Sequence, residues 1–237
     1  MNVPALSPAL ALFLDFDGTL APIQADPVAV FLPEGGANTL LQVAQMLSGA
    51  LMILSGRDIR DLSRRTPAGL WRAGGHGAFV CPPGADPPAT LPEAPPDLVA
   101  ALSEMTAPLG GVRIEQKGPV LAVHYRQAPE QGERLYAGMS ALLDGFAGYS
   151  LQSGKMVIEA RPADVDKGSC IRRLMKNPVF ASRTPVMIGD DTTDEDAMRV
   201  CLDAGGWAIK VGEGQTLAPY RLESPGAVWR WLEEREI

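Results

Sequence analysis

Two aspartates one residue apart follow an apolar run near the start of the chain. The segment LFLDFDGTLAPI, residues 12–23, places Asp15 and Asp17 directly after that run. Because side chains alternate along a strand, we expect both carboxylates to point the same way, with Phe16 directed to the opposite face. Burying two such acids costs several kcal/mol unless a cation compensates them. A hard cation with oxygen ligands would do so, and the first candidate is Mg²⁺.

A second acidic cluster follows another apolar run. The segment GDDTTDED, residues 189–196, supplies Asp190, Asp191 and Asp194 directly after PVMI. The alternative explanation for an acid in such a place is a turn or a helix cap, which Asp-Gly sequences form routinely. A cap needs one acid or at most two, and three exceed that need. The two clusters together therefore favour a metal site.

Four short runs rich in strand-forming residues predict the elements that position these acids. They are ALALFLDFDG from Ala9, ALMILSGR from Ala50, PVMIGDD from Pro185 and GGWAIKVG from Gly205. Helical patterns at 34–47, 58–65, 167–175 and 194–202 lie between them. This alternation is typical of a doubly wound α/β fold, with a mostly parallel, Rossmann-like sheet. In such a sheet, ligands bind beyond the carboxyl ends of the strands, where the polar strand endings would gather.

The middle of the chain has a different pattern. The proline-rich segment CPPGADPPATLPEAPP, residues 81–96, indicates a linker, because proline interrupts helices and central strands. Strand-like and helix-like segments joined by short glycine-containing turns follow it, which indicates an antiparallel sheet backed by helices. We therefore predict a core domain of residues 1–82 and 161–237 and an inserted α+β cap domain of residues 83–160. Such an insertion could close over the strand ends and exclude water.

Composition excludes some classes of partner. The chain has 21 Lys and Arg against 28 Asp and Glu, a net charge of -7, which argues against nucleic acid as a partner. The apolar start is interrupted by acids before it could span a membrane, and it lacks the basic flank of a leader peptide. Three widely separated cysteines indicate reduced thiols. We expect a cytoplasmic monomer that binds no membrane.

Four segments in order resemble the haloacid dehalogenase-like phosphatases. They are DFDGT (15–19), SGR (55–57), the lysine of DKG (167) and GDDTTDED (189–196). The resemblance implies that Asp15 attacks phosphorus, while Asp17 protonates the leaving oxygen and then activates water. It implies that Ser55 and Lys167 hold the phosphoryl oxygens. It also places Mg²⁺ on Asp15, the backbone carbonyl of Asp17 and Asp190, with Thr19, Asp191 and Asp194 around those ligands.

A wider resemblance, to the trehalose 6-phosphate phosphatases, includes the inserted segment. It rests on DGTLAPI, SGR, GGHGA (74–78), an E-x-K pair before HYR, GKMVIEARP and DKG. A sugar needs carboxylates as acceptors and amines as donors, which this set supplies. The resemblance implies sugar binding by Glu115, Lys117 and Glu159, supported by Arg161. The other residues expected to contact substrate are Gly18, Gly56, Arg57, Gly75 and His76.

Several of these residues have a simpler alternative explanation. Lys167 could be an exposed lysine at a helix start, although the helix dipole disfavours a cation there. Ser55 could be a turn residue, and Arg57 could pair with a surface acid. The charged residues at alternate positions of the insertion could form an ordinary solvent-exposed sheet face. We interpret His124, between Val123 and Tyr125, as a packed structural histidine.

Three hypotheses for function follow. The first is a Mg²⁺-dependent phosphatase that converts trehalose 6-phosphate to trehalose and phosphate through an aspartyl phosphate. The second is another enzyme of the same superfamily, either a phosphatase of sucrose 6-phosphate or mannosyl-3-phosphoglycerate, or a mutase that returns the phosphate to sugar. The third is a sugar-phosphate-binding module without turnover. Asp15, Asp17, Lys167 and Asp190 argue against the third, since a binding module needs neither a nucleophile nor a proton donor.

Overall fold

The structure is a computed structural model and describes residues 3–234. The chain forms two compact units, Met1–Pro87 together with Asp166–Ile237, and Pro88–Val165. We call the first the core unit and the second the inserted unit. The boundaries fall at 87/88 and 165/166, whereas the sequence analysis places them at 82/83 and 160/161.

Two hydrogen bonds explain where the units divide. Residues just before position 87 remain attached to the core unit, because Arg72 Nη2 donates to the Ala85 carbonyl at 2.5 Å. At the other boundary, the Ala163 N–H donates to the Gly148 carbonyl at 2.8 Å, which ties residues beyond 160 to the inserted unit. Neither contact is encoded in a local sequence pattern.

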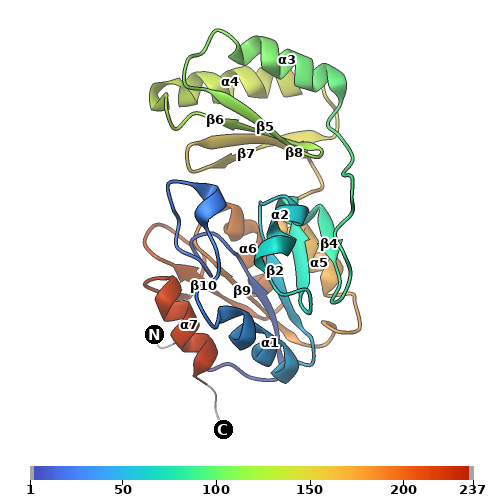
Figure 1. The fold of residues 1–237 in the computed structure, drawn as a ribbon, viewed down its shortest axis with the longest axis vertical. Helices are drawn as coiled ribbons and strands as arrows, with labels where there is room; N and C mark the ends of the chain where they lie inside the picture. The colour runs from blue at the N-terminus through green and yellow to red at the C-terminus, as the bar shows by residue number, and fades with distance from the viewer. Residues whose placement is uncertain (1–2, 235–237) are drawn as a thin grey trace. The chain divides into compact units, whose positions relative to one another are not determined.

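A seven-stranded sheet, counted within the described residues, forms the centre of the core unit (Figure 1). Its order is β11-β10-β9-β1-β2-β3-β4, and all neighbouring strands are parallel except β3 and β4. The strands are β1 (Leu10–Leu14), β2 (Leu51–Leu54), β3 (Trp71–Gly74), β4 (Phe79–Cys81), β9 (Thr184–Gly189), β10 (Trp207–Val211) and β11 (Tyr220–Leu222). Every residue of β1 and β2 is buried, as expected of central strands covered on both faces. The predicted doubly wound α/β fold is confirmed.

Helices follow the strands of the core unit in the expected alternation. They are α1 (Gly36–Met46), α2 (Ile59–Arg65), α5 (Lys167–Leu174), α6 (Glu195–Asp203) and α7 (Pro225–Glu233). Three short 3₁₀ turns, η1 (Pro27–Ala29), η2 (Gly75–Gly77) and η4 (Thr192–Asp194), lie in the loops. Helix α1 packs against α7, and α5 packs against α6. The order β9-β1-β2 brings the loops after β1, β2 and β9 side by side, and all three carry predicted site residues.

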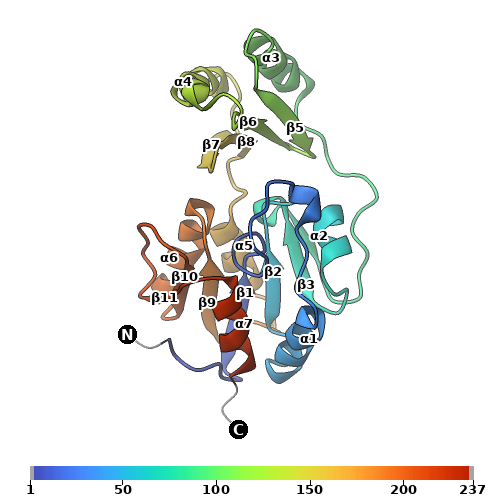
Figure 2. The ribbon, with the colours of Figure 1, turned by 60° about the vertical axis from the view of Figure 1, so that its left-hand side comes forward.

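The inserted unit is a four-stranded antiparallel sheet with two helices on one face (Figure 2). Its strand order is β5-β6-β8-β7, from β5 (Arg113–Lys117), β6 (Val120–His124), β7 (Tyr149–Gly154) and β8 (Val157–Pro162). Its helices are α3 (Pro96–Thr106) and α4 (Gly132–Leu143), with the 3₁₀ turn η3 (Pro129–Gln131) before α4. Leu121, Val123 and Ile158 from the sheet form a buried core with residues of both helices. The alternate residues therefore form the opposite face of the sheet.

The cysteines agree with the sequence analysis. Cys81, Cys170 and Cys201 are all buried, unbridged thiols. Burial raises the pKa of Cys170 to about 11 and also raises the pKa of the other two, so these thiols stay protonated at neutral pH. Within residues 3–234, no helix has the length and apolar character needed to cross a membrane.

Candidate active site

Asp15 directly follows β1 and occupies the centre of the site. Its backbone N–H donates to the Ile188 carbonyl of β9 at 3.0 Å, so the parallel pairing with β9 fixes its position. The residue is 5% exposed, and burial is the main reason that its carboxyl pKa is raised well above the ordinary value. The Lys167 amine, 2.6 Å from Asp15 Oδ1, partly opposes that rise. Asp15 is therefore a buried carboxyl group held in one orientation by a cation.

Lys167 is the first residue of α5 and is 2% exposed, so it is not an exposed lysine at a helix start. Its Nζ lies 2.6 Å from Asp15 Oδ1 and 2.6 Å from Asp194 Oδ1. Burial alone would lower the pKa of this amine, but the two carboxylates outweigh burial and raise it above the ordinary value. Lys167 therefore remains a cation and joins the loop after β1 to the loop after β9.

Three carboxylates converge beside Lys167. One oxygen from each of Asp15, Asp190 and Asp194 lies within 4.8 Å of the other two. Glycines make the approach possible, because a Cβ on Gly18 would lie 2.1 Å from Asp190 Oδ2, and one on Gly189 would lie 2.3 Å from Asp194 Oδ2. Asp15 and Asp190, predicted from the sequence to share a metal site, lie together in the structure.

The electrostatics of this cluster suit a divalent cation. Burial, together with the charges of Asp194 and Asp191, raises the pKa of Asp190 to about 7. A positive charge placed beside this carboxyl group stabilises its charged form. All the converging ligand atoms are oxygens, which matches the preference of hard cations such as Mg²⁺. The residues therefore fit the predicted metal.

Asp17 takes a different partner from Asp15. Its two carboxylate oxygens accept from Arg57, at 2.6 Å from Nη2 and 2.7 Å from Nε. Arg57 is itself held by Asp61 Oδ2 at 2.8 Å and by the Pro27 carbonyl at 2.9 Å. Asp17 is thus clamped by a bidentate ion pair, which fixes a carboxylate more firmly than a lysine contact would.

β1 ends before the two aspartates. The prediction that Asp15 and Asp17 point the same way assumes that both belong to one strand with alternating side chains, but β1 ends at Leu14 and a tight loop follows. In that loop, the N–H groups of Leu20 and Ala21 both donate to the Phe16 carbonyl at 3.0 Å. Loop geometry therefore places the carboxylates of Asp15 and Asp17. Asp15 pairs with the amine of Lys167, and Asp17 pairs with the guanidinium of Arg57.

The loop after β2 carries the SGR segment. Ser55 is 1% exposed, and its Oγ accepts from the Arg57 N–H at 3.1 Å. The GGHGA segment folds onto this loop, since the His76 N–H donates to the Ser55 carbonyl at 3.0 Å and the Gly75 N–H donates to the Arg57 carbonyl at 2.7 Å. The His76 imidazole covers Gly56, where a Cβ would lie 2.7 Å from the ring. His76 has a positive φ of 56°, a strained conformation for a non-glycine residue.

Thr19 and Asp191 belong to the loops that follow β1 and β9. Thr19 is fully buried, and its hydroxyl has no hydrogen-bond partner among the described residues. Asp191 caps η4, with its Oδ1 2.7 Å from the Thr192 N–H, while Asp194 Oδ2 accepts from the Asp191 N–H at 3.0 Å. These hydrogen bonds fix the conformation of the loop that follows β9.

Lys210 and Asp61 are functional neighbours of the site that the sequence motifs do not include. Lys210 is 4% exposed at the end of β10, and its amine donates to the Asp190 carbonyl. Its signal was a single lysine inside the apolar run GGWAIKVG. Asp61, in the first turn of α2, follows Arg57 by four residues and pairs with it at 2.8 Å, a spacing that could have indicated the contact although Arg57 lies before the helix.

The residues predicted to bind sugar lie in the inserted unit, on the sheet face opposite α3 and α4. Glu115, Glu159 and Gln152 fall in register across the sheet. Lys117 Nζ lies 3.3 Å from Glu159 Oε1 and 3.9 Å from Glu115 Oε2. Arg161 Nη2 donates to Gln152 Oε1 at 2.6 Å. The structure therefore places this charged set on one face of the inserted sheet, with Lys117 between the two glutamates and Arg161 on Gln152.

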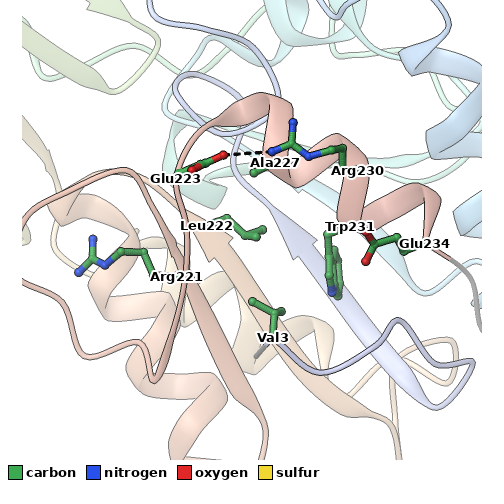
Figure 3. Close-up of a pocket in the computed structure, with 8 residues that line it drawn as sticks. All are labelled: Val3, Arg221, Leu222, Glu223, Ala227, Arg230, Trp231 and Glu234. Carbon is green, nitrogen blue, oxygen red and sulfur yellow. Dashed lines mark hydrogen bonds and ion pairs between the residues drawn. The ribbon is translucent and has the colours of Figure 1, made fainter. Parts of the chain in front are cut away.

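A shallow pocket of about 620 Å³ lies elsewhere in the core unit, beside β11 and α7 (Figure 3). Its two arginines already have partners, because Arg230 Nη2 pairs with Glu223 Oε1 at 3.1 Å and Arg221 donates to the Gly214 carbonyl at 2.8 Å. None of the predicted site residues lines this pocket. It does not compete with the acidic cluster as the reactive centre.

Comparisons with known proteins assign the chain to a family. A family model described as trehalose-phosphatase matches residues 13–225. The chain belongs to the trehalose-phosphatase family. It is 37% identical to the trehalose-6-phosphate phosphatase of Escherichia coli (strain K12) over 235 residues, which cover 98% of this chain and 88% of that protein. A probable trehalose-phosphate phosphatase of Sinorhizobium fredii is 38% identical over 209 residues, 85% of this chain and 77% of that protein.

Solved structures agree with this assignment. The C-terminal domain of the trehalose-6-phosphate phosphatase of C. albicans matches with a TM-score of 0.79 and 25% identity, covering 95% of this chain and 91% of that one. A haloacid dehalogenase-like hydrolase from Bacteroides thetaiotaomicron shares the fold, with a TM-score of 0.67, 15% identity and coverage of 94% and 98%. The predicted resemblance is confirmed. As a member of the trehalose-phosphatase family, the protein is an enzyme, a phosphoric monoester hydrolase.

Proposed function

We propose that the protein hydrolyses trehalose 6-phosphate to trehalose and phosphate in a Mg²⁺-dependent reaction that passes through an aspartyl phosphate on Asp15. The observation that carries this proposal is the buried contact of Asp15 with Lys167 beside Asp190, in a member of the trehalose-phosphatase family. The names of the relatives supply the substrate. The three reduced thiols are compatible with a cytoplasmic enzyme of trehalose biosynthesis.

In the first half-reaction, a carboxylate oxygen of Asp15 attacks the phosphorus and the bond to the sugar oxygen breaks. Asp17 donates a proton to the leaving oxygen. Arg57 donates to both oxygens of Asp17 and so holds this carboxyl group in one orientation. Lys167 and Ser55 stabilise the phosphoryl oxygens, and the aspartyl phosphate of Asp15 results.

In the second half-reaction, Asp17 takes a proton from water, and the water oxygen attacks the phosphorus of the aspartyl phosphate. Phosphate leaves and the Asp15 carboxylate is restored. Asp15, Asp190 and the Asp17 carbonyl would hold Mg²⁺. When bound, the ion would neutralise phosphoryl charge and orient the group for in-line attack. Asp194 keeps Lys167 in place, and Asp191 keeps the β9 loop in shape.

The inserted unit would supply sugar recognition. Glu115 and Glu159 offer acceptors and Lys117 offers donors to sugar hydroxyls, with Arg161 in support. A site built from such groups discriminates strongly, because a substrate without the matching hydroxyl leaves a polar group unpaired. Gly18, Gly56, Gly75, His76 and Arg57 complete the proposed substrate contacts in the core unit.

Phosphate release from a panel of sugar phosphates tests this function. We expect clear turnover of trehalose 6-phosphate with Mg²⁺ and loss of turnover after chelation. Turnover of sucrose 6-phosphate or mannosyl-3-phosphoglycerate without any turnover of trehalose 6-phosphate would overturn the substrate. Phosphate label retained on sugar would indicate a mutase, and binding without any turnover would indicate a sugar-phosphate-binding module.

The metal should stabilise the protein more at higher pH. In the metal-free protein, burial and the charges of Asp194 and Asp191 raise the pKa of Asp190 to about 7, so this carboxyl is mostly neutral at about pH 6 and ionised at about pH 8. The raised pKa means that the metal-free fold loses stability as the pH rises through this range. Mg²⁺ binds the ionised form, and we expect the melting temperature to rise more on Mg²⁺ addition at about pH 8 than at about pH 6.

Differential scanning fluorimetry with and without Mg²⁺ measures this difference. Asp190→Asn should largely remove both the metal effect and its pH dependence. An equal metal-induced shift at both pH values, or a larger one at the lower pH, would contradict the assignment of Asp190 as a metal ligand.

A further inference from the structure

His124 lies on the polar face of the inserted sheet and not in the core of that unit. It pairs in register with Arg113 and Val157, and its side chain is 30% exposed. The neighbouring Val123 points to the other face and belongs to the core beneath α3 and α4. The sequence interpretation of His124 as a packed structural histidine therefore differs from its position in the structure.

The imidazole of His124 contacts a residue proposed to bind sugar. His124 Nε2 lies 2.8 Å from Glu115 Oε2, a hydrogen-bond distance. Lys117, two residues from Glu115 on the same strand, is 3.9 Å from the same oxygen and is nearer to Glu159, at 3.3 Å. Among the described residues, His124 therefore makes the close contact that fixes the Glu115 carboxylate. This hydrogen bond is also the main reason that the pKa of Glu115 is lowered.

A fixed orientation matters for a glutamate that recognises a sugar hydroxyl. An unrestrained Glu side chain has many rotamers and must lose that freedom when it binds a ligand. With Oε2 held by His124, the other oxygen, Oε1, keeps its acceptor capacity in one place. Ala122, directly across from Glu115 in the register, presents only a methyl group between Glu115 and Glu159.

We propose that His124 is a positioning residue for substrate binding: its Nε2–H donates to Glu115 Oε2 and so directs Oε1 toward a hydroxyl of the sugar. This inference rests on the proposed function, because it needs a sugar phosphate as the substrate. His124 acts through Glu115 and takes no part in the phosphoryl chemistry.

Three variants separate positioning from a structural role. In His124→Leu a side chain of similar size lacks the donor, and we expect KM for trehalose 6-phosphate to rise about tenfold while kcat stays within about twofold. In His124→Gln the amide nitrogen stands close to the place of Nε2, so KM should stay within about threefold of the wild type. Gln116→Leu, on the same strand as Glu115 but on the other face, should leave both constants unchanged.

A double-mutant cycle completes the test. In a Glu115→Ala background, His124→Leu should cause no further rise in KM, because the carboxylate that it positions is gone. If His124→Leu loses its fold, seen as a lower melting temperature and a lost kcat, His124→Asn replaces it, since the shorter amide cannot reach Glu115.

Two outcomes would overturn the inference: an unchanged KM in His124→Leu, or an equal loss in His124→Leu and His124→Gln. If the wild-type protein hydrolyses another phosphate ester but not trehalose 6-phosphate, the proposed function is refuted, and this inference is refuted as well because it rests on that function. Normal wild-type turnover of trehalose 6-phosphate with an unchanged KM in His124→Leu would refute the inference alone.

Discussion

Asp15→Asn should lower phosphate release from trehalose 6-phosphate by about 10⁴-fold or more, because the amide cannot act as a nucleophile toward phosphorus. The change is nearly isosteric, and the Asp15 carboxyl is already disfavoured in its charged form by burial and by Asp194 and Asp190. We therefore expect the folded protein and its sugar binding to survive. Initial-rate assays with Mg²⁺ and a thermal melt of the same preparation measure the two effects.

The matched control is Asp203→Asn, which makes the same chemical change at an exposed residue at the end of α6. It should retain wild-type turnover. Turnover by Asp15→Asn at close to the normal rate would show that the covalent mechanism is wrong. An unfolded Asp15→Asn protein would instead show that the carboxylate is needed for the fold, contrary to the expectation above.

Lys167→Met should have the largest effect on stability. The substitution keeps a long side chain but removes the cation that lies 2.6 Å from both Asp15 and Asp194. Two buried carboxylates are then left without their partner, which is expected to lower the free energy of unfolding by about 3–5 kcal/mol. Turnover should also fall by about 10²–10³-fold, since one donor to the phosphoryl oxygens is lost.

Urea unfolding at neutral pH, without added metal, measures the change in stability. Lys176→Met is the matched control, because this lysine is exposed beyond the end of α5, and it should unfold like the wild type. Lowering the pH should restore part of the stability of Lys167→Met, since protonation removes the unpaired charges. A loss below about 1 kcal/mol would place Lys167 among exposed ion pairs and contradict the buried triad.

The parts of the fold that could be predicted are those encoded in local patterns. β1, β2 and β9 are continuous apolar runs, and acids follow β1 and β9. The parallel sheet then places the loops after these strands at one edge. β3 was not predicted, because its sequence WRAG is short and contains Arg72, a charged residue that is 2% exposed. A buried arginine interrupts the apolar pattern from which a central strand is recognised.

Which residues belong to the site was easier to predict from the sequence than which of them contact each other. The contact of Asp17 with Arg57 depends on a tight loop after β1 and on the loop after β2, which are 40 residues apart in sequence. His124 and Glu115 meet because β5 and β6 pair in one particular register. A one-residue shift of that register would move His124 to the other face of the sheet. Residue types could be assigned from motifs, whereas their hydrogen-bond partners required the structure.

A crystal structure with Mg²⁺ and beryllium trifluoride, a mimic of the phosphoryl group, tests the central claim most directly. We predict the mimic bonded to a carboxylate oxygen of Asp15, with Mg²⁺ contacted by Asp15, Asp190 and the Asp17 carbonyl, and with Lys167 and Ser55 on the fluorides. The mimic attached to a different residue, or the ion bound away from Asp15 and Asp190, would contradict the account.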